Sequence, residues 1–236
     1  ETTQSSASDV VGSVSATVSG TTIVDGKHGN GRAFNGSSDS ISFPHRSSLS
    51  FDRTDAFSLE AWVKTDSMAS GLAYIAKMGN SDPYTGYSAL IHQGYVIFQL
   101  INSYSGENRM WVTGSTLVSD GKWHHVVITY DGSSSASGVT IYVDGKADTP
   151  TIVQNTLTSS TTNTTAVTIG SRTGGSYFDG AVDEVRIYST EISASLVQSH
   201  YSEGSSSPST VRTSRSDYVQ EGSYSLNIDS AGYSID

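Results

Sequence analysis

The sequence predicts an all-β domain, and three observations support this prediction. Ser, Thr and Gly recur throughout its 236 residues, while Val, Ile, Tyr and Phe supply much of the apolar content, as in pleated, half-buried strands. Short apolar runs are separated by turn residues at the spacing typical of a sandwich or barrel. Apolar and polar residues also alternate within the clearest runs. The length allows one large β domain with a single core.

The strand at 57–64 carries the strongest pattern, because Phe57, Leu59, Ala61 and Val63 would share one face. In the first half of the chain we expect further strands at 72–77, 87–92, 95–101 and 109–112. In the second half we expect them at 123–130, 139–143, 166–170 and 178–188, with a hairpin turn at 144–145.

One short helix is expected from Ser193, its predicted N-cap, to about Tyr201. A Gly/Ser/Pro-rich linker follows at 204–209. The segment 210–236 regains alternation at Tyr224, Leu226 and Ile228. It is expected to be a β extension or the start of a further repeat or domain.

Charge and composition exclude several classes of partner and site. Thirteen basic and 23 acidic side chains give a net charge of −10, which disfavours nucleic acid and anionic membrane surfaces. The chain has no cysteine, so it has neither disulfides nor a thiolate metal site. Its longest apolar runs are too short for membrane insertion. It starts at Glu1 without a leader, from which we expect a processed or excised chain.

Five further segments resemble, in order, laminin-G-like domains of bacterial and archaeal surface proteins and glycan-degrading enzymes. They are VDGKHGNGRAFNG with DSISFP (24–36 and 39–44), FSLEAWVK (57–64), GKWHHVVITYDG (121–132), VTIYVDG (139–145) and FDGAVDEVRIY (178–188). The resemblance covers about residues 7–201. It implies a laminin-G-like domain over 1–203, built as a two-sheet antiparallel jelly-roll sandwich. One curved sheet and its rim loops would form the usual ligand surface.

Asp183 is the first candidate site residue. Strand alternation groups it with Ala181, Val185 and Ile187, so its carboxylate should be buried and need a partner. The resemblance implies that this residue faces the glycine-rich loop and helps to hold a structural calcium ion (Ca2+). Asp25, Asn30 and main-chain oxygens could complete such a site. The alternative is a carboxylate held by loop N–H groups without a metal.

The sequence offers no catalytic constellation. His124 and His125 are adjacent, so in a strand they point to opposite faces and cannot bind one ion together. The resemblance implies a structural role, with Trp123 or the first histidine packed in the sandwich. The paired carboxylates of related glycosidases are missing, as are G-x-S-x-G and H-E-x-x-H motifs. We therefore expect no enzymatic activity.

Aromatic and planar polar residues gather between positions 84 and 111. Sugars stack on aromatic rings while their hydroxyls need paired hydrogen bonds, so this mixture could bind glycans. The candidate residues are Tyr104, Arg109 and Trp111. The alternative is that half of these rings fill the core.

The two ends suggest a further role. The family's usual opening strand is missing before Glu1, and the final residues Tyr233 to Asp236 resemble it when read on into Glu1. Tyr233 and Ile235 could therefore complete the sheet of a neighbouring copy or adjacent domain. We expect a structural or adhesive repeat of an extracellular or cell-surface fibre, stalk or adhesin. The alternative is a carbohydrate-binding module of a larger secreted glycan-degrading enzyme.

Overall fold

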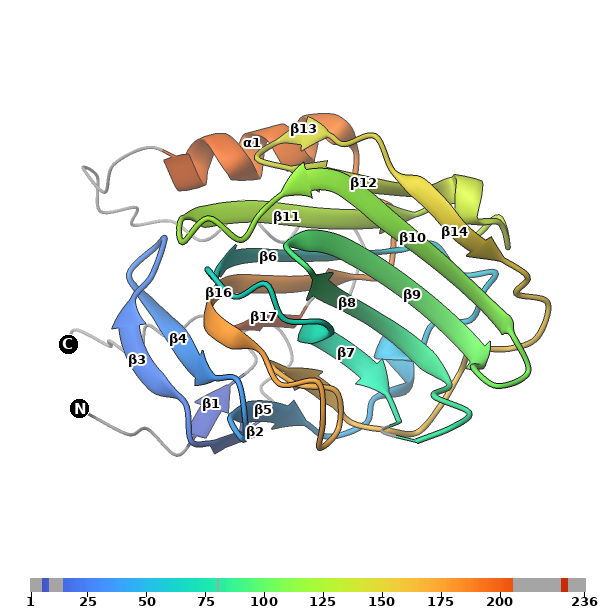
Figure 1. The fold of residues 1–236 in the computed structure, drawn as a ribbon, viewed down its shortest axis with the longest axis horizontal. Helices are drawn as coiled ribbons and strands as arrows, with labels where there is room; N and C mark the ends of the chain where they lie inside the picture. Colours follow the sequence, from blue (N-terminus) through green and yellow to red (C-terminus); the bar gives the residue numbers. More distant parts are fainter. Residues whose placement is uncertain (1–5, 9–14, 80, 206–225, 229–236) are drawn as a thin grey trace.

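The computed structural model describes residues 6–8, 15–79, 81–205 and 226–228. Two antiparallel sheets pack face to face (Figure 1). We call the sheet nearer the viewer in Figure 1 the front sheet and the other the back sheet. The predicted all-β sandwich is confirmed.

The front sheet consists, in spatial order, of β1 (Ser6–Ser8), β2 (Ser15–Ser19), β5 (Ser40–Phe43), β15 (Val167–Ile169), β7 (Leu72–Met78), β8 (Gly86–His92), β9 (Tyr95–Ser103), β10 (Asn108–Leu117) and β14 (Thr151–Asn155). The back sheet consists of β13 (Lys146–Ala147), β12 (Val139–Val143), β11 (Trp123–Tyr130), β6 (Phe57–Lys64), β16 (Asp179–Tyr188), β4 (Asn30–Asn35) and β3 (Thr22–Asp25), and β17 (Leu226–Ile228) also pairs with β16. Two short 3-10 helices lie at Ser47–Leu49 and Ala136–Gly138.

Most predicted strands form close to their predicted bounds. Strands β6, β11 and β12 begin and end where the sequence places them. Strand β10 is longer than predicted and continues to Leu117, while β14 was not predicted. Strand β14 is a mostly exposed edge strand that pairs with β10 alone, so its residues TIVQN carry no alternating apolar signal.

The core lies between the two sheets and contains a cluster of aromatic rings. Phe51 and Phe57 stack with centroids 4.5 Å apart, and Tyr87 packs against both rings. The predicted inner face of β6, which includes Phe57 and Leu59, lies in this core. Its opposite face is buried as well, because helix α1 (Ala194–Ser205) packs over the back sheet through Val197.

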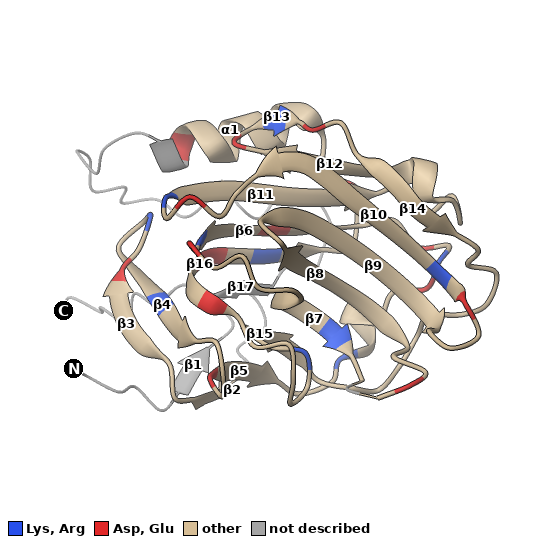
Figure 2. Cartoon of the chain, viewed as in Figure 1, with Lys and Arg blue, Asp and Glu red and all other residues tan. Residues whose placement is uncertain are grey.

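Helix α1 begins where the sequence predicts it. The hydroxyl of Ser193 accepts a hydrogen bond from the Leu196 N–H at 3.3 Å, as an N-cap does. The helix ends at Ser205, two residues into the predicted linker. No helix among the described residues is long and apolar enough to cross a membrane. Figure 2 shows basic and acidic residues scattered over the same elements, without a continuous basic stripe in this view.

Strand β17 is described at the C-terminal end of the chain. Residues Leu226–Ile228 pair antiparallel with residues 185–187 of β16. Strand β4 pairs with β16 only from Asp179 to Val182, so β17 continues the same edge where β4 has left it. The predicted linker beyond Ser205 lies outside the described residues, and so do Tyr233 and Ile235.

A β-bulge in β16 gives the Asp183 side chain a different orientation from the predicted one. The register with β6 shifts between Asp183 and Arg186, and Glu184 adopts a φ of 49°. Val182 and Val185 therefore both face the core, and Asp183 shares no face with Val185 or Ile187. The predicted grouping was wrong because strict alternation cannot anticipate a bulge. Asp183 is nevertheless buried, because the β3–β4 loop covers it.

Candidate ligand-binding face

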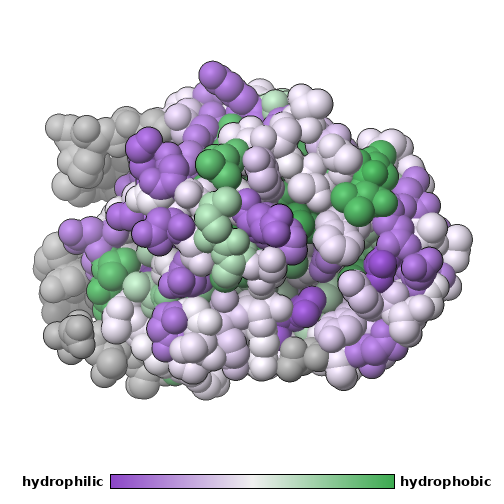
Figure 3. All heavy atoms as spheres, in the orientation of Figure 1, coloured by the Kyte–Doolittle hydropathy of each residue, from purple (hydrophilic) through white to green (hydrophobic). Residues whose placement is uncertain are grey.

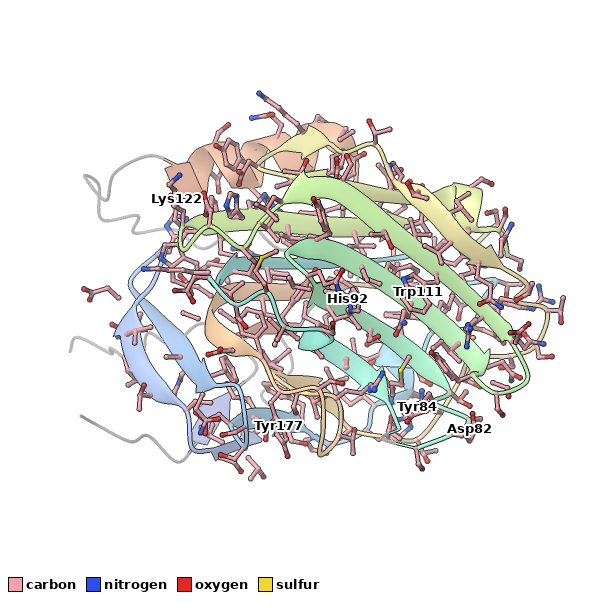
Figure 4. All side chains as sticks on the ribbon, viewed as in Figure 1. Asp82, Tyr84, His92, Trp111, Lys122 and Tyr177 are labelled. Carbon is pink, nitrogen blue, oxygen red and sulfur yellow. The ribbon has the colours of Figure 1, made fainter. Side chains whose placement is uncertain are left out.

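Trp111 lies on the outer face of the front sheet, in β10. Its strand neighbours Met110 and Val112 are fully buried in the core, so alternation directs Trp111 outward. Figure 4 shows Trp111 over the front sheet between β9 and β14. Its partly buried ring packs against Ala73, Leu90 and Ile97 of the three preceding strands. The ring therefore has a fixed apolar support.

Two glutamines flank this ring. Gln99 in β9 and Gln154 in β14 are the cross-strand partners of Trp111. The Ser88 hydroxyl donates to the Gln99 amide oxygen at 3.3 Å, and Arg109 Nε donates to that of Gln154 at 2.6 Å. The Gln154 amide also donates to the Glu107 carbonyl and the Thr156 hydroxyl, at 3.1 Å each, so the indole lies between two fixed polar side chains and offers a rigid stacking surface.

Tyr104 and Arg109 form a contact pair beside Trp111. The Arg109 guanidinium carbon lies 4.0 Å from the centroid of the Tyr104 ring, a cation–π geometry. Arg109 Nη1 also donates to the Tyr104 carbonyl oxygen at 2.8 Å. Tyr104 is 41% exposed. The structure thus brings together two of the three predicted ligand residues and places the third on the same face.

The other aromatic residues of this region are divided between the core and the rim. Tyr87 is buried, and its hydroxyl donates to the Leu49 carbonyl at 3.1 Å, so the core alternative holds for this ring. Tyr95 is exposed at the start of β9, opposite Leu117. Figure 4 shows Tyr177 near β5, away from Trp111. Figure 3 shows the apolar residues of this side as separate green patches among polar ones.

Asp183 is held by the loop between β3 and β4. Its Oδ2 accepts the His28 N–H at 2.9 Å, and its Oδ1 accepts the Glu184 N–H at 2.8 Å. Burial raises the pKa of Asp183 to about 6, and these N–H donors oppose the rise. A side chain at Gly26 would place its Cβ 2.5 Å from the Asp183 carboxylate, so only glycine lets the loop approach this closely.

This arrangement matches the hydrogen-bonded alternative more closely than a calcium site. Calcium needs six to eight oxygen ligands, whereas the loop presents N–H donors to the Asp183 carboxylate. Asp25 and Asn30 pair across the β3–β4 hairpin and are both exposed. Within the described residues, no three His, Cys, Asp or Glu side chains are grouped to hold a metal ion. The calcium site stays a prediction.

A buried polar cluster that the sequence did not reveal lies on the outer face of the back sheet. The fully buried Glu60 carboxylate contacts Arg186 Nη1 at 2.9 Å and, at 3.0 Å each, His125 Nε2, His200 Nδ1 and the Tyr188 hydroxyl. Burial alone would raise the pKa of Glu60, but these partners hold it well below its usual range. Glu60 is thus an internal anion that ties β6, β11 and β16 to α1.

The two adjacent histidines point to opposite faces, as predicted. His125 is fully buried beneath α1, where its ring lies 5.1 Å from that of Trp62. His124 contacts Asp144 at 2.9 Å and Asp120 at 3.0 Å at the sheet rim. The fully buried histidine is therefore the second one, because the outer face of β11 is covered by the helix.

Comparison with known families assigns the fold. A model of the Concanavalin A-like lectin/glucanases superfamily matches residues 34–198. The chain belongs to this superfamily. Membership confirms the family resemblance and the jelly-roll sandwich. No curated protein matches the chain.

Three solved structures are similar to this superfamily member. Domain 4 of AbnA, a GH43 extracellular arabinanase from Geobacillus stearothermophilus in complex with arabinotriose, is 21% identical with a TM-score of 0.61, over 81% of this chain and 91% of that domain. The binding domain of Paraclostridial Mosquitocidal Protein 1 is 18% identical with a TM-score of 0.64, over 81% and 48%. The botulinum neurotoxin serotype G binding domain is 20% identical with a TM-score of 0.57, over 85% and 51%.

These identities show a shared fold alone. The chain spans about half the length of the two toxin binding domains. The matched domain of the arabinanase is covered almost completely.

Proposed function

We propose that this chain is a non-catalytic, extracellular carbohydrate-binding module, whose ligand lies across the outer face of β9, β10 and β14. The observation that carries this proposal is the Trp111 ring, supported by apolar side chains and flanked by Gln99 and Gln154. The indole offers its exposed surface to the C–H face of a sugar, and the polar side chains around it can bond to hydroxyls at the edge of the ring.

The comparisons are consistent with this proposal. Domain 4 of AbnA was solved with arabinotriose, and nearly all of it matches this chain. A module of a larger secreted enzyme or surface protein would have this size and fold.

The positions of the carboxylates support a non-catalytic role. Retaining and inverting glycosidases need two accessible carboxyl groups about 5 to 10 Å apart on the substrate face. Glu60 is enclosed on the opposite side of the sandwich, and Asp183 is buried under its loop. Glu107 is exposed in the turn before β10, and no motif in the sequence pairs it with a second carboxylate on one strand face.

The test is a glycan array probed with the wild-type chain and with Trp111→Ala. We expect the variant to lose about tenfold or more in affinity for every glycan bound, because the stacking surface is removed. Tyr95→Ala is the matched control, since Tyr95 is an exposed aromatic residue at the far end of β9. Equal loss in both variants, or no glycan bound by the wild type, would refute the proposal.

A second candidate function is the structural or adhesive repeat. The observation in its favour is the pairing of β17 with residues 185–187 of β16, which shows that this edge accepts a strand. If the same segment can pair with the β16 edge of a second copy, chains would link end to end.

Disulfide trapping tests this exchange, because the chain has no native cysteine. Val185 and Ile228 are register partners, so the double variant Val185→Cys/Ile228→Cys can form a bridge either within a chain or between chains. Exchange between copies predicts disulfide-linked oligomers that increase with protein concentration. Internally bridged monomers at every concentration would contradict it.

A further inference from the structure

Four side chains on the same side of the molecule as Trp111 form a continuous row with an arginine at each end and two tyrosines between them, which we call the arginine–tyrosine ladder. Arg109 covers the Tyr104 ring at 4.0 Å, Tyr104 meets the Tyr84 ring edge-on at 5.6 Å, and Arg172 covers Tyr84 at 4.7 Å. Three separate segments of the chain supply these residues. Figure 4 shows Tyr84 below Trp111 on the same front side of the molecule.

The backbone fixes both tyrosines. Tyr84 has a φ of 56°, a left-handed conformation that is unfavourable for a bulky side chain. Its N–H donates to the Ser81 carbonyl at 2.8 Å, and the Tyr104 N–H donates to the Pro83 carbonyl at 3.0 Å. The Asp82 carboxylate accepts the N–H and hydroxyl of Ser105, both at 2.8 Å. The two loops are thus joined to each other.

Arg172 is held just as firmly by its own hairpin. Arg172 and Gly175 exchange two backbone hydrogen bonds of 2.8 Å, and the Thr173 hydroxyl donates to the Met78 carbonyl at 2.9 Å. These backbone bonds hold Arg172 so that its guanidinium lies over the Tyr84 ring. Among the described residues, none of its three nitrogens is hydrogen-bonded, and only Nε is fully buried.

The charge of Arg172 is therefore partly removed from water and not compensated. Burial lowers its pKa, as expected for a cation that loses solvent. Arg109 uses Nε and Nη1 within the protein and keeps Nη2 without a partner. In the described part of the chain neither arginine forms an ion pair, because Asp82 is directed to Ser105 and Glu107 contacts neither guanidinium.

A third positive charge lies close to this end of the sheet. Lys77 is buried near the end of β7, and its Nζ contacts only His45, Asn163 and the Thr165 carbonyl in the described structure. Met78, which accepts the bond from Thr173, is the next residue. Figure 2 shows the basic positions of β7 and β10 on this side of the molecule.

We propose that the arginine–tyrosine ladder is a subsite for a carboxylated sugar unit of the uronic acid class. The proposal rests on the proposed function, because the unit would be linked to the sugar on Trp111. Arg109 and Trp111 are two residues apart on one strand face, hence about 7 Å apart, which is close to the length of one sugar unit. A guanidinium fork matches a carboxylate in shape and charge, and the tyrosine rings contact the sugar ring.

The experiment measures binding of matched glycans by calorimetry. The probes are an oligogalacturonide and the same oligosaccharide after chemical reduction of its carboxyl groups. We expect the wild-type chain to prefer the acidic form about tenfold to a hundredfold, the size of a charge-assisted hydrogen bond, and to lose this preference at high salt. Arg172→Gln should remove most of the preference, because it should weaken binding of the acidic form much more than binding of the reduced form.

Two further variants separate the possible failures. Arg172→Lys keeps the charge but not the fork, so it should recover only part of the preference. Trp111→Ala should weaken both probes equally. Equal wild-type affinity for both probes, or equal loss of both in Arg172→Gln, overturns the acidic subsite while the proposed function stands. Binding of neither probe overturns the acidic subsite, and the proposed function falls with it only if the whole array is also empty.

Discussion

The two outer faces of the sandwich use similar residues in opposite ways. On the back sheet, the Arg186 guanidinium and the Tyr188 hydroxyl both bond to Glu60, beneath α1. On the front sheet, Arg172 lies over Tyr84 and Arg109 over Tyr104, and neither arginine bonds to a carboxylate among the described residues.

The difference lies in where the hydrogen-bonding capacity is used. The back cluster pairs its central anion with four donors from inside the fold, so these bonds serve the stability of the fold. The front face orders rings and guanidinium groups and leaves donors unused, so it gains most when a ligand supplies acceptors. Residue type alone therefore does not distinguish a structural cluster from a binding face.

Among the variants that test this contrast, Glu60→Ala is expected to have the largest effect on stability. The substitution leaves Arg186 with the Glu184 carboxylate but without that of Glu60, and it removes the polar contact between the back sheet and His200 of α1. Loss of one partner of a buried ion pair costs about 3 to 5 kcal/mol. For a domain of this size, the melting temperature should fall by roughly 10 °C or more, measured by circular dichroism. Glycan binding on the front face should persist below that temperature.

Glu107→Ala is the control of the same residue type. Glu107 is exposed in the turn before β10, so its removal should change stability by no more than about 0.5 kcal/mol. If Glu60→Ala and Glu107→Ala melt at the same temperature, the back cluster does not hold α1 and the contrast between the faces fails.

The strands were predictable where the core imposes a strict period. In β6 and β11, alternate residues enter the core, so both bounds follow from the sequence. Strand β14 gives no such signal because it is exposed and paired on one side only. The predicted orientation of Asp183 was wrong because a bulge at Glu184 shifts the alternation of side chains along β16.

The candidate site was predictable only along one strand. Arg109 and Trp111 share a face because they are two residues apart, and Tyr104 lies in the turn just before them. Tyr84 opens the aromatic stretch that the sequence indicated, but Arg172 could not be included, because its contact with Tyr84 depends on two loops that are 88 positions apart, the difference between 172 and 84. The roles of Tyr104, Arg109 and Trp111 in ligand binding stay predictions.

Asp183 in β16 should have a smaller effect on stability than Glu60, with the opposite dependence on pH. Its pKa is raised to about 6 in the folded state, from an ordinary 3.8, so between about pH 4 and pH 6 the folded chain holds a proton that the unfolded chain has lost. The free energy of unfolding should therefore fall as pH rises through this window, by about 2 kcal/mol from this group. The low pKa of Glu60 acts in the other direction, because its stabilisation is lost as pH falls.

Asp183→Asn isolates this contribution. Urea unfolding of the wild type and the variant at pH 4, 5, 6 and 7 should show that the wild type loses stability relative to the variant as pH rises. An unchanged difference across the window would mean that Asp183 titrates normally and is not buried as the structure has it.

The same pair of proteins tests calcium at this loop. Calcium binds the ionised carboxylate, so a calcium site should raise the melting temperature of the wild type at pH 7 when calcium replaces a chelator, and should do so much less at pH 5. Asp183→Asn should abolish that rise. If the N–H donors of His28 and Glu184 are the only partners of the carboxylate, calcium and chelator will give the same melting temperature at both pH values. The Asp183 loop would then resemble the Glu60 cluster, in that both carboxylates are held by donors from within the fold.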